Sequence, residues 1–391
     1  MPRRICFVTG SRAEYGLIYW LLKDVGADPE LELQLVATGA HLAEKFGNTH
    51  KDMEKDGFTI DARVDIQAGD DTPTGIARSM GLGIAGMGEA FERLKPDIVA
   101  ILGDRYEILA AAQAALVAGI PIAHIHGGEL SEGAIDDAMR HAITKMAHLH
   151  FTAAEEYSRR AIQLGEDPAR VFNVGAPGLD NIHRLSLLSR EELAKAVGSP
   201  LGEDFFLVTY HPATASGVSP QTAVGELIAA LENFPGHQVL ITGVNADRGH
   251  RAIANSLAAY AQSNPDRVFL YSSLGQLRYL SALKHCAAVI GNSSSGIIEA
   301  PALKTPTVNI GARQRGRLRA CSVIDCEEER EDIAAAINRA LSPDFRSLAE
   351  TAENPYGGAG ASDRIKEVLK SAALDGIQMK RFHDIHGGNG R

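Results

Sequence analysis

The residues best suited to chemistry gather in one stretch, from His124 to His141. It holds three histidines, four carboxylates and three glycines, and it follows an apolar run typical of a buried strand. Polar loops on a rigid sheet edge are commonly active-site loops. We therefore expect acid/base catalysis here, with His126, Glu129 and Asp136 as candidates. The alternatives are a zinc site on the His-x-His pair and a polar loop whose acidic residues only cap the next helix.

A metal is not the expected outcome, because no distant Cys or His pair completes a ligand set for this stretch. The four cysteines contain no C-x-x-C pair, and two of them lie in or beside apolar runs. They are interpreted as free buried thiols in a reducing cytoplasm.

Two motifs in the first half of the chain could bind an anion. One apolar run leads into Gly10–Gly16, where a glycine turn and a helix N-terminus would offer N–H groups to a phosphate, and Arg12 a guanidinium fork. Another run ends at Gly103 and is followed by Asp104 and Arg105. We expect Asp104 to accept a proton and Arg105 to bind phosphate. The alternatives are a solvated Arg12 and an Asp104 that only caps a helix.

The second half carries residues that could hold a nucleotide. His211 closes an apolar run, and a ligand-facing and a structural role are equally weighted. Ile290–Glu299 has the pattern of a strand, a Gly/Ser loop and a helix, which suits a diphosphate, and Glu299 could bind both ribose hydroxyls. After another apolar run, Arg313, Arg315 and Arg317 could cover the phosphates. The alternatives are a simply capped helix for the first segment and a solvated loop for the three arginines. The candidate ligand contacts are Ser293, Ser294, Gly296, Glu299 and Arg313.

The segment Gly81–Gly86 matches G-x-G-x-x-G, but we reject it as a dinucleotide fingerprint. That fingerprint needs a strand before it and a helix after it. Here the flanking apolar residues fall at helical spacing on both sides. The glycines are expected to permit close packing of a single helix.

Along the chain, short β-branched runs alternate with stretches of helical periodicity. This rhythm predicts parallel sheets covered on both faces, with the strand ends and their ligands at one edge. The predicted strands are Ile5–Thr9, Leu33–Thr38, Ile98–Leu102, Ile120–Ile125, Val171–Val174, Phe205–Thr209, Val239–Thr242, Val268–Tyr271, Ala288–Ile290 and Thr307–Ile310.

The strands fall into two groups, separated by Ser186–Asp204, which holds a short helix-like piece before Gly198–Gly202 and is interpreted as an interdomain linker. The predicted fold class is α/β, with two doubly wound Rossmann-like domains facing a cleft. Their expected extents are 1–185 and 200–360, and a helix at about 361–380 is expected to pack back on the first domain. A length of 391 residues fits two domains.

Composition narrows the class of protein further. The net charge of −10 argues against a nucleic-acid partner, which would usually meet a basic face. The longest apolar stretch, Ile108–Ala123, is interrupted by polar and helix-breaking residues, so no membrane span is expected. The N-terminus does not resemble a signal peptide. These features predict a cytoplasmic protein.

Taken together, the motifs resemble the UDP-N-acetylglucosamine 2-epimerase family over nearly the whole chain. The opening T-G-S-R-A-E-Y and the S-E-G-A-I-D-D stretch are similar to its hydrolysing branch, which serves sialic and legionaminic acid synthesis. The other branch usually opens with a G-T-R-P-E-like turn. The motifs that carry the resemblance are Gly10–Tyr15, Gly103–Arg105, Gly127–Glu129, Ala134–Lys145, His211–Pro212, Gly291–Gly296, Thr305–Pro306 and Gly311–Gln314.

The resemblance implies the glycosyltransferase-B architecture, a UDP-sugar substrate and no cofactor. It implies removal of the C2 proton, expulsion of UDP to give a glycal, and hydration to the 2-epimer, which is N-acetylmannosamine if the substrate is UDP-N-acetylglucosamine. By position, Asp104 and Asp136 match catalytic carboxylates, and His211 matches a histidine of the cleft. The positions that match UDP contacts are Arg12, Ser293, Ser294, Glu299 and Arg313.

One departure concerns the second acid/base group. Some hydrolysing relatives have Glu at the position of His126, and this chain has one extra residue before Asp136. Either His126 or Glu129 would then fill that role. The change could also accompany a different sugar, such as the 2,4-diacetamido-trideoxy sugar of the legionaminate route.

Three other functions remain open at this stage. They are a glycosyltransferase of the same architecture, a non-hydrolysing epimerase, and a nucleotide-sugar sensor without activity. Family likeness further suggests a homodimer or homotetramer.

Overall fold

The computed structural model describes residues 1–67, 72–131, 135–202, 204–212, 218–243 and 250–385. The chain divides into two compact units, and each is described by itself. Unit 1 contains Met1–Glu129, Ile135–Asn181 and the chain from Tyr356 onward. Unit 2 contains Ile182–Pro355 together with Leu130 and Ser131.

Unit 1 is built on a parallel sheet whose seven described strands have the order β3-β2-β1-β4-β5-β6-β7. The strands are β1 (Arg3–Thr9), β2 (Leu31–Thr38), β3 (Ala62–Val64), β4 (Ile98–Leu102), β5 (Ile122–Ile125), β6 (Leu149–Thr152) and β7 (Val171–Asn173). The helices are α1 (Arg12–Ala27), α2 (His50–Lys55), α3 (Pro73–Leu94), α4 (Tyr106–Val117), α5 (Ile135–Met146), α6 (Glu155–Gln163) and α15 (Ala361–Ser371), and the short helix α7 (Asp180–Arg184) begins in unit 1 and ends in unit 2.

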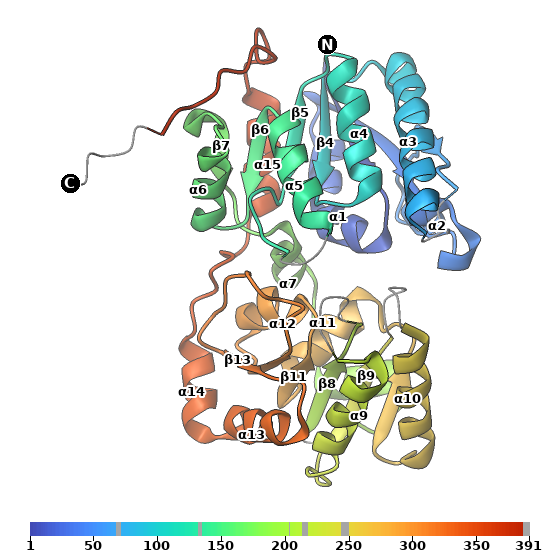
Figure 1. The fold of residues 1–391 in the computed structure, drawn as a ribbon, viewed down its shortest axis with the longest axis vertical. Helices are drawn as coiled ribbons and strands as arrows, with labels where there is room; N and C mark the ends of the chain where they lie inside the picture. The colour runs from blue at the N-terminus through green and yellow to red at the C-terminus, as the bar shows by residue number, and fades with distance from the viewer. Residues whose placement is uncertain (68–71, 132–134, 203, 213–217, 244–249, 386–391) are drawn as a thin grey trace, which may run out of the picture. The chain divides into compact units, whose positions relative to one another are not determined.

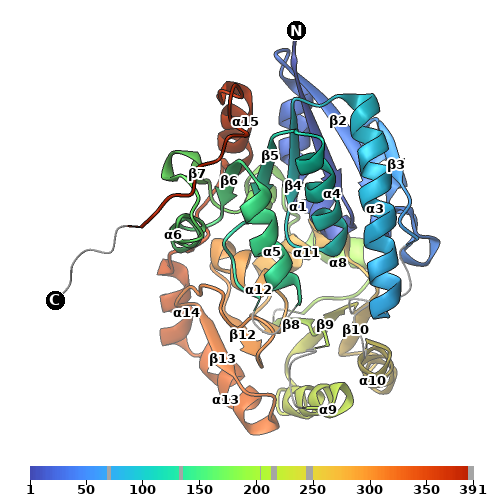
Figure 2. The same ribbon diagram turned by 45° about the horizontal axis from the view of Figure 1, so that its top comes forward.

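Both faces of this sheet are covered by helices, as the continuous apolar character of its strands requires. Successive side chains of a strand point to opposite faces. In β1, Ile5 and Phe7 pack in one cluster with residues of α1 and α15. Cys6 and Val8 pack in the other cluster with residues of α3, α4 and α5. These last three helices lie side by side along one face of the sheet (Figures 1 and 2).

Unit 2 repeats this plan with a parallel sheet of six described strands in the order β10-β9-β8-β11-β12-β13. The strands are β8 (Phe205–Thr209), β9 (Gln238–Thr242), β10 (Val268–Tyr271), β11 (Ala288–Gly291), β12 (Thr307–Ile310) and β13 (Val323–Cys326). The helices are α8 (Arg190–Val197), α9 (Pro220–Leu231), α10 (His250–Ser263), α11 (Gly275–His285), α12 (Ser295–Ile298), α13 (Arg330–Leu341) and α14 (Pro343–Thr351).

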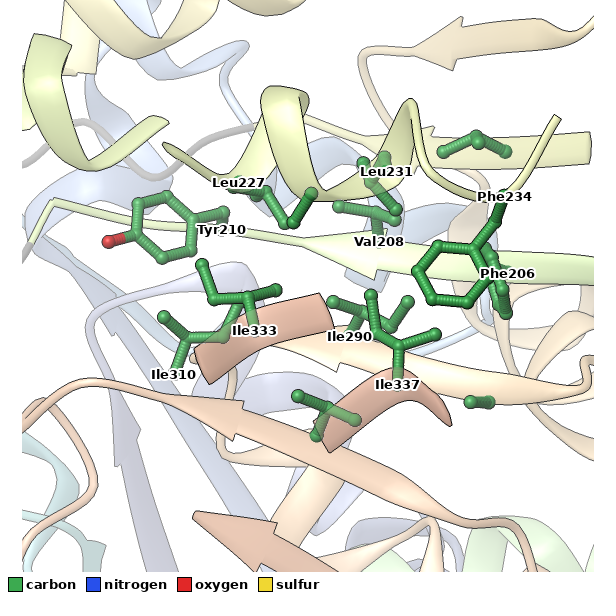
Figure 3. Packing of buried hydrophobic residues seen from close by; sticks show 14 of the residues in the cluster. Phe206, Val208, Tyr210, Leu227, Leu231, Phe234, Ile290, Ile310, Ile333 and Ile337 are labelled. Atoms are coloured by element: carbon green, nitrogen blue, oxygen red, sulfur yellow. The ribbon is translucent and has the colours of Figure 1, made fainter. Parts of the chain in front are cut away.

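The core of unit 2 lies largely between its sheet and helices α9 and α13. Figure 3 shows Phe206 and Val208 of β8 between Leu231 of α9 and Ile337 of α13. All four side chains are fully buried. The neighbouring β8 residues point to the opposite face, where they meet α8 and α11.

In both sheets the strand order reverses beside the first strand of the unit. In unit 1 the chain runs outward from β1 to β3 and then restarts at β4 on the other side of β1. In unit 2 the corresponding neighbours are β8 and β11. Ligands of doubly wound sheets bind beyond the carboxyl ends of the strands at such points. The loops after β1, β4, β8 and β11 are therefore the places to look for function.

The expected fold class, two doubly wound α/β domains of the glycosyltransferase-B type, is confirmed. All ten predicted strands are present, with ends shifted by at most two residues. Three strands were missed, β3, β6 and β13, because each has only three or four residues and includes a polar or charged one.

The rejection of the G-x-G-x-x-G match is confirmed, because Gly81, Gly83 and Gly86 all lie inside α3. A Cβ at Gly83 would lie 3.0 Å from Ala110 of α4, and one at Gly86 would lie 2.7 Å from Val64 of β3. Both glycines therefore permit close packing. No described helix has the length and apolar character needed to cross a membrane.

Two expectations are corrected. Ser186–Asp204 is not a free linker, because α8 lies within it and buries Leu193 and Val197 in the core of unit 2. The cysteines are not all buried, because Cys321 is exposed on the turn that precedes β13.

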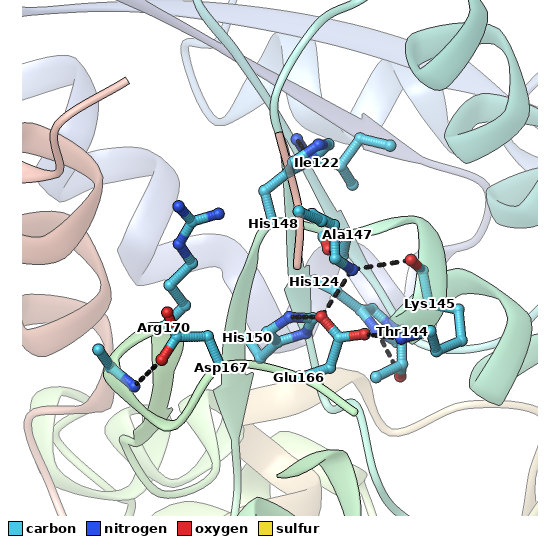
Figure 4. Close-up of polar contacts among 12 residues, drawn as sticks. Ile122, His124, Thr144, Lys145, Ala147, His148, His150, Glu166, Asp167 and Arg170 are labelled. Atoms are coloured by element: carbon cyan, nitrogen blue, oxygen red, sulfur yellow. Dashed lines mark hydrogen bonds and ion pairs between the residues drawn. The ribbon is translucent and has the colours of Figure 1, made fainter. Parts of the chain in front are cut away.

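The C-terminal segment belongs to unit 1 and is held there by an unusual buried ion cluster. Lys380 Nζ donates to Glu166 Oε2 at 2.6 Å and to the carbonyl oxygens of Lys145 and Ala147 at 2.8 and 2.6 Å. Glu166 is 1% exposed and also binds Lys145 and His150. Figure 4 shows His150 and Lys145 next to the Glu166 carboxylate. The segment after α15 is thereby tied to the C-terminal end of α5.

Candidate active site

The switch point of unit 1 is occupied by two buried carboxylates and one arginine. Glu14 and Glu107 are 6% and 1% exposed. Arg105 Nε donates to Glu107 Oε1 at 2.8 Å and lies 3.9 Å from Glu14 Oε1. These residues come from the first turns of α1 and α4, which follow β1 and β4.

Gly10 at the end of β1 allows this packing. A Cβ there would lie 2.5 Å from Glu107 Cγ. The N–H of Gly10 donates to Glu14 Oε2 at 2.8 Å. The N–H of Gly10, expected to face a phosphate, is thus taken up by a carboxylate of the chain itself. Arg12 lies exposed at the first position of α1.

Asp104 follows β4 and forms an ion pair with Arg140 of α5. The Arg140 side chain is 4% exposed and that of Asp104 is 19% exposed. Asp136, one helical turn before Arg140, is partly buried. Burial and the negative charge of Asp104 raise the pKa of Asp136. The structure thus brings the two predicted carboxylates close enough to interact, and makes Asp136 the better proton acceptor.

His126 and Glu129 form a second pair of interacting titratable side chains. The His126 ring contacts the Glu129 carboxylate through Nδ1, and both residues are buried. Because a carboxylate only accepts, Nδ1 carries the proton and Nε2 is the basic nitrogen. Within the described residues, Nε2 is buried and has no hydrogen-bond partner. It is therefore the ring nitrogen that the described part of the protein leaves unengaged.

The backbone at this pair is sharply turned. His126 has φ of 65°, in the left-handed region that few non-glycine residues adopt. The conformation directs the chain away from β5 and brings Glu129 back to the His126 ring. Such strain costs about 1–3 kcal/mol and is typical of functional loops.

His124, the other histidine of the His-x-His pair, has a structural role. Its Nε2 donates to the carbonyl of Gly103 at 2.8 Å, and its Nδ1 lies 3.2 Å from Thr144 Oγ1. Burial lowers its pKa to about 3. Since both ring nitrogens are engaged, His124 connects β5 to the loop before Asp104 and is not placed to bind a metal.

In unit 2, Asn292 connects the two strands at the switch point. The His211 N–H donates to Asn292 Oδ1 at 2.7 Å, and Asn292 Nδ2 donates to the His211 carbonyl at 2.8 Å. Asn292 is fully buried. Burial and the charge of Arg313 lower the pKa of His211 to about 3. The imidazole is therefore neutral at pH 7 and can both donate and accept a hydrogen bond.

The loop after β12 is fastened to the same asparagine. Arg313 Nη1 and Gln314 Nε2 donate to the Asn292 carbonyl at 3.1 and 2.9 Å. Arg313, expected to contact UDP, thus lies beside His211 and the end of β11. Arg313 therefore supplies a cationic donor and His211 a neutral donor in the same small region.

The Gly/Ser segment is shorter as a helix than expected. α12 has only four residues, and Glu299 is its partly buried C-cap residue, with a pKa raised by burial. Ser293 and Ser294 precede the helix and are partly buried. A Cβ at Gly296 would lie 2.8 Å from Thr307 Cγ2, so close packing on β12 requires glycine there.

Sequence reasoning placed Asp104, Asp136 and His126 correctly at strand and helix ends, but it assigned no role to several neighbours. Glu14 and Glu107 stood in motifs that had been noted. Their position in the first helical turn after a strand could have marked them as residues near the ligand edge of the sheet. The partners assigned no role in advance are Glu14, Glu107, Arg140, Asn292 and Gln314.

Comparison with known proteins gives the family. The UDP-N-acetylglucosamine 2-epimerase family model matches residues 23–370. A Campylobacter jejuni protein, GDP/UDP-N,N′-diacetylbacillosamine 2-epimerase (hydrolyzing), is 41% identical, and the match covers 98% of this chain and 99% of that protein. The Escherichia coli polysialic acid biosynthesis protein P7 is 40% identical, with 98% of each chain covered.

A solved structure agrees with these matches at the level of the fold. The Neisseria meningitidis UDP-GlcNAc 2-epimerase, crystallised with UDP-GlcNAc, has a TM-score of 0.81 and 17% sequence identity, and covers 94% of this chain and 99% of its own. The strand-end positions of the acid/base residues and the full-length sequence matches lead to one conclusion. The chain belongs to the UDP-N-acetylglucosamine 2-epimerase family, in its hydrolysing branch.

Proposed function

We propose that this protein is a hydrolysing UDP-sugar 2-epimerase in which unit 1 transfers protons and unit 2 binds the uridine diphosphate. The observation that carries the proposal is the pairing of Asp136 with the Arg140-bound Asp104, near the start of α5. Such a pair supplies a base of raised proton affinity in a chain of this family.

In the first step a base removes the proton at C2 of the sugar while the C1–O bond breaks. The bonding electrons leave with UDP, and a glycal with a C1–C2 double bond remains. Asp136 is the proposed base, because burial and the Asp104 charge raise its pKa. Asp104 is engaged in an ion pair with Arg140, whereas Asp136 is assigned the proton transfer.

The departing diphosphate needs positive charge or strong donors. The proposed contacts in unit 2 are Arg313, the neutral imidazole of His211 and the hydroxyls of Ser293 and Ser294. Asn292 supports this assignment, because it holds both His211 and the Arg313 loop. Glu299 is proposed to bind the ribose hydroxyls.

In the second step water adds to the glycal. The oxygen bonds to C1, and C2 receives a proton on the opposite face, which inverts its configuration. We assign this proton transfer to His126: its Nε2, the free nitrogen, takes the proton released by the attacking water and passes it to C2, while Glu129 holds the proton on Nδ1 and Asp136 returns its own proton to solvent. This assignment chooses between the two residues that sequence reasoning had left open.

Two sugars are candidates for the substrate. The name of the relative that is 41% identical favours N,N′-diacetylbacillosamine carried by GDP or UDP, and the name of a Legionella pneumophila relative, 35% identical, gives the UDP form. The name of the 40% identical relative points to polysialic acid synthesis and favours UDP-N-acetylglucosamine. We place the diacetamido sugar first, because the 41% and 35% identical relatives are named for it and His126 stands where some hydrolysing relatives have glutamate. Either product would serve the synthesis of a sialic or legionaminic acid.

Proton NMR in D₂O, without added metal or cofactor, tests the reaction and the substrate together. Free UDP with a 2-epimer that carries deuterium at C2 is the expected result for one of the two sugars. A product that still carries UDP would indicate the non-hydrolysing reaction. If both sugars persist unchanged after long incubation, the proposal is wrong.

A matched pair of variants tests Asp136, the residue that carries the proposed function. Asp136→Asn should lower kcat about 10²–10⁴-fold, the range typical of lost general-base catalysis. Asp137→Asn is the control, since Asp137 lies one residue further along α5 and forms an ion pair with His141 at 3.5 Å. Equal losses in both variants would contradict the assignment of Asp136.

The oligomeric state and the cellular location remain predictions. Light scattering should give two or four times the chain mass of 41.7 kDa if the protein is a homodimer or homotetramer. A cytoplasmic location would suit a substrate made from UTP.

A further inference from the structure

A cluster of three charged side chains at the end of β1 is not used in the steps above. Glu14 and Glu107 are both buried. Among the described residues, Arg105 donates a hydrogen bond to Glu107 and lies within ion-pair distance of Glu14. Two ionised carboxylates and one arginine would leave a net negative charge out of contact with water. Such a charge is expensive, and carboxyl groups in that situation bind a proton instead.

The geometry shows that both carboxylates are packed around one residue. The Gly10 N–H donates to Glu14 Oε2, and a Cβ at Gly10 would lie 2.6 Å from Glu107 Oε1. A Cβ at Gly39 would also lie 3.2 Å from that oxygen. In the described part of the chain, Glu14 Oε1 and Glu107 Oε2 are buried and lack hydrogen-bond partners. A proton on one carboxyl would supply the missing donor.

The arginine decides which carboxyl is ionised. Arg105 Nε is bonded to Glu107 at 2.8 Å but lies 3.9 Å from Glu14. Glu107 is therefore the stabilised anion, and Glu14 is the group that takes the proton. Burial and the Glu107 charge raise the pKa of Glu14 to about 8, which agrees with this assignment.

We propose that Glu14 and Glu107 share one proton, with Glu14 neutral and Glu107 ionised, and that Glu107 positions Arg105 to bind an anionic group of the substrate. The inference rests on the proposed function. Glu107 holds only the Nε atom of Arg105. No described residue bonds its two Nη atoms, and its side chain is 47% exposed. A planar fork oriented in this way suits a phosphate or carboxylate oxygen pair.

The other groups around Glu14 do not titrate in a way that would imitate this proton. Asp104 carries its negative charge nearby and raises the pKa of Glu14 further. His41, on the turn after β2, is neutral over the relevant range, because burial lowers its pKa to about 4. Arg105 stays charged, because Glu107 raises its pKa.

Two conservative variants separate the members of the pair. Glu14→Gln keeps a neutral group in place, so kcat/KM at pH 7 should stay within about threefold of wild type. Glu107→Gln removes the anion that holds Arg105, so kcat/KM should fall about 10²-fold or more. Equal effects of the two substitutions would overturn the proposal.

A double-mutant cycle tests whether Glu107 acts through Arg105. After Arg105→Ala, the Glu107→Gln change should lower kcat/KM by less than about threefold, because its target is gone. A purely structural role would give the full loss again. Full additivity would therefore overturn the positioning role.

A measurement without substrate keeps this proposal separate from the proposed function. A carboxyl with a folded-state pKa of about 8, against an ordinary value of 4.5, binds its proton more tightly when folded. Its contribution to stability is complete below about pH 4.5 and is lost as the pH rises to about 8. Unfolding by urea should show this decline in wild type, and Glu14→Gln should lack it. Parallel pH profiles of the two proteins would refute proton sharing, even if no UDP-sugar is turned over.

Discussion

Replacement of Lys380 by methionine should destabilise unit 1 by about 2–3 kcal/mol. The Lys380 ammonium makes three short contacts, to Glu166 and to the carbonyls of Lys145 and Ala147. Loss of one partner of a buried ion pair costs about 3–5 kcal/mol when the other charge is left alone. Here Lys145 and His150 remain on the Glu166 carboxylate, so its charge is not left alone and the loss should be smaller, about 2–3 kcal/mol.

The assay uses the single tryptophan of the chain. Trp20 lies in α1, so its fluorescence reports the unfolding of unit 1 without a signal from unit 2. The free energy of unfolding is obtained by linear extrapolation over urea concentration, with the m-value checked for constancy. Lys55→Met is the control, because that side chain is 76% exposed and its ion pair should contribute less than about 0.5 kcal/mol.

The pH dependence of the free energy of unfolding gives a second test of the Lys380→Met variant. Although burial opposes it, hydrogen bonds from His150, Lys145 and Lys380 lower the pKa of Glu166 to about 2. The stability from this group is therefore present above about pH 4.5 and is lost as the pH falls towards 2. In Lys380→Met the loss should begin at higher pH. An unfolding midpoint and an acid limb equal to those of wild type would refute the account of the C-terminal anchor.

Three further predictions follow from packing and exposure. Gly10→Ala should destabilise unit 1 by about 1–3 kcal/mol through overpacking. Gly81→Ala has open space around it in α3, so it should be neutral or stabilise the protein by up to about 1 kcal/mol. Urea unfolding followed by Trp20 fluorescence compares the two variants, and equal losses of stability would contradict the packing argument. Asn292→Ala should lower the local stability of unit 2 by about 2–3 kcal/mol, measured by hydrogen exchange, and unchanged protection would contradict this. A thiol reagent should modify one native cysteine rapidly, and Cys321→Ser should abolish that fast phase.

The resemblance and the strand rhythm predicted most of the fold. Continuous apolar runs such as β4 and β8 are recognisable because both faces of a parallel sheet are buried. The short strands β3, β6 and β13 were missed, since three or four residues with polar members carry too little periodic signal. The helix α8 was taken for a linker because its buried residues, Leu193 and Val197, meet a surface that only unit 2 as a whole provides.

For the candidate site, the sequence by itself determined which strand ends carry chemistry. Asp104 lies just after β4 and Asp136 lies in the first turn of α5, which follows β5. Parallel strands place their carboxyl ends at one edge, so residues directly after them must gather there. This is why the positions of His126 and His211 were also predictable.

Only the tertiary structure decided how these residues are paired and charged. Asn292 reaches His211 across 81 residues, and Lys380 reaches Ala147 across 233. Such contacts depend on how each helix settles against its neighbours to within a fraction of an ångström, which local sequence does not specify. The same precision buries Glu14 beside Glu107, and burial sets which of the two is ionised, because a charge is stable there only with a bonded partner.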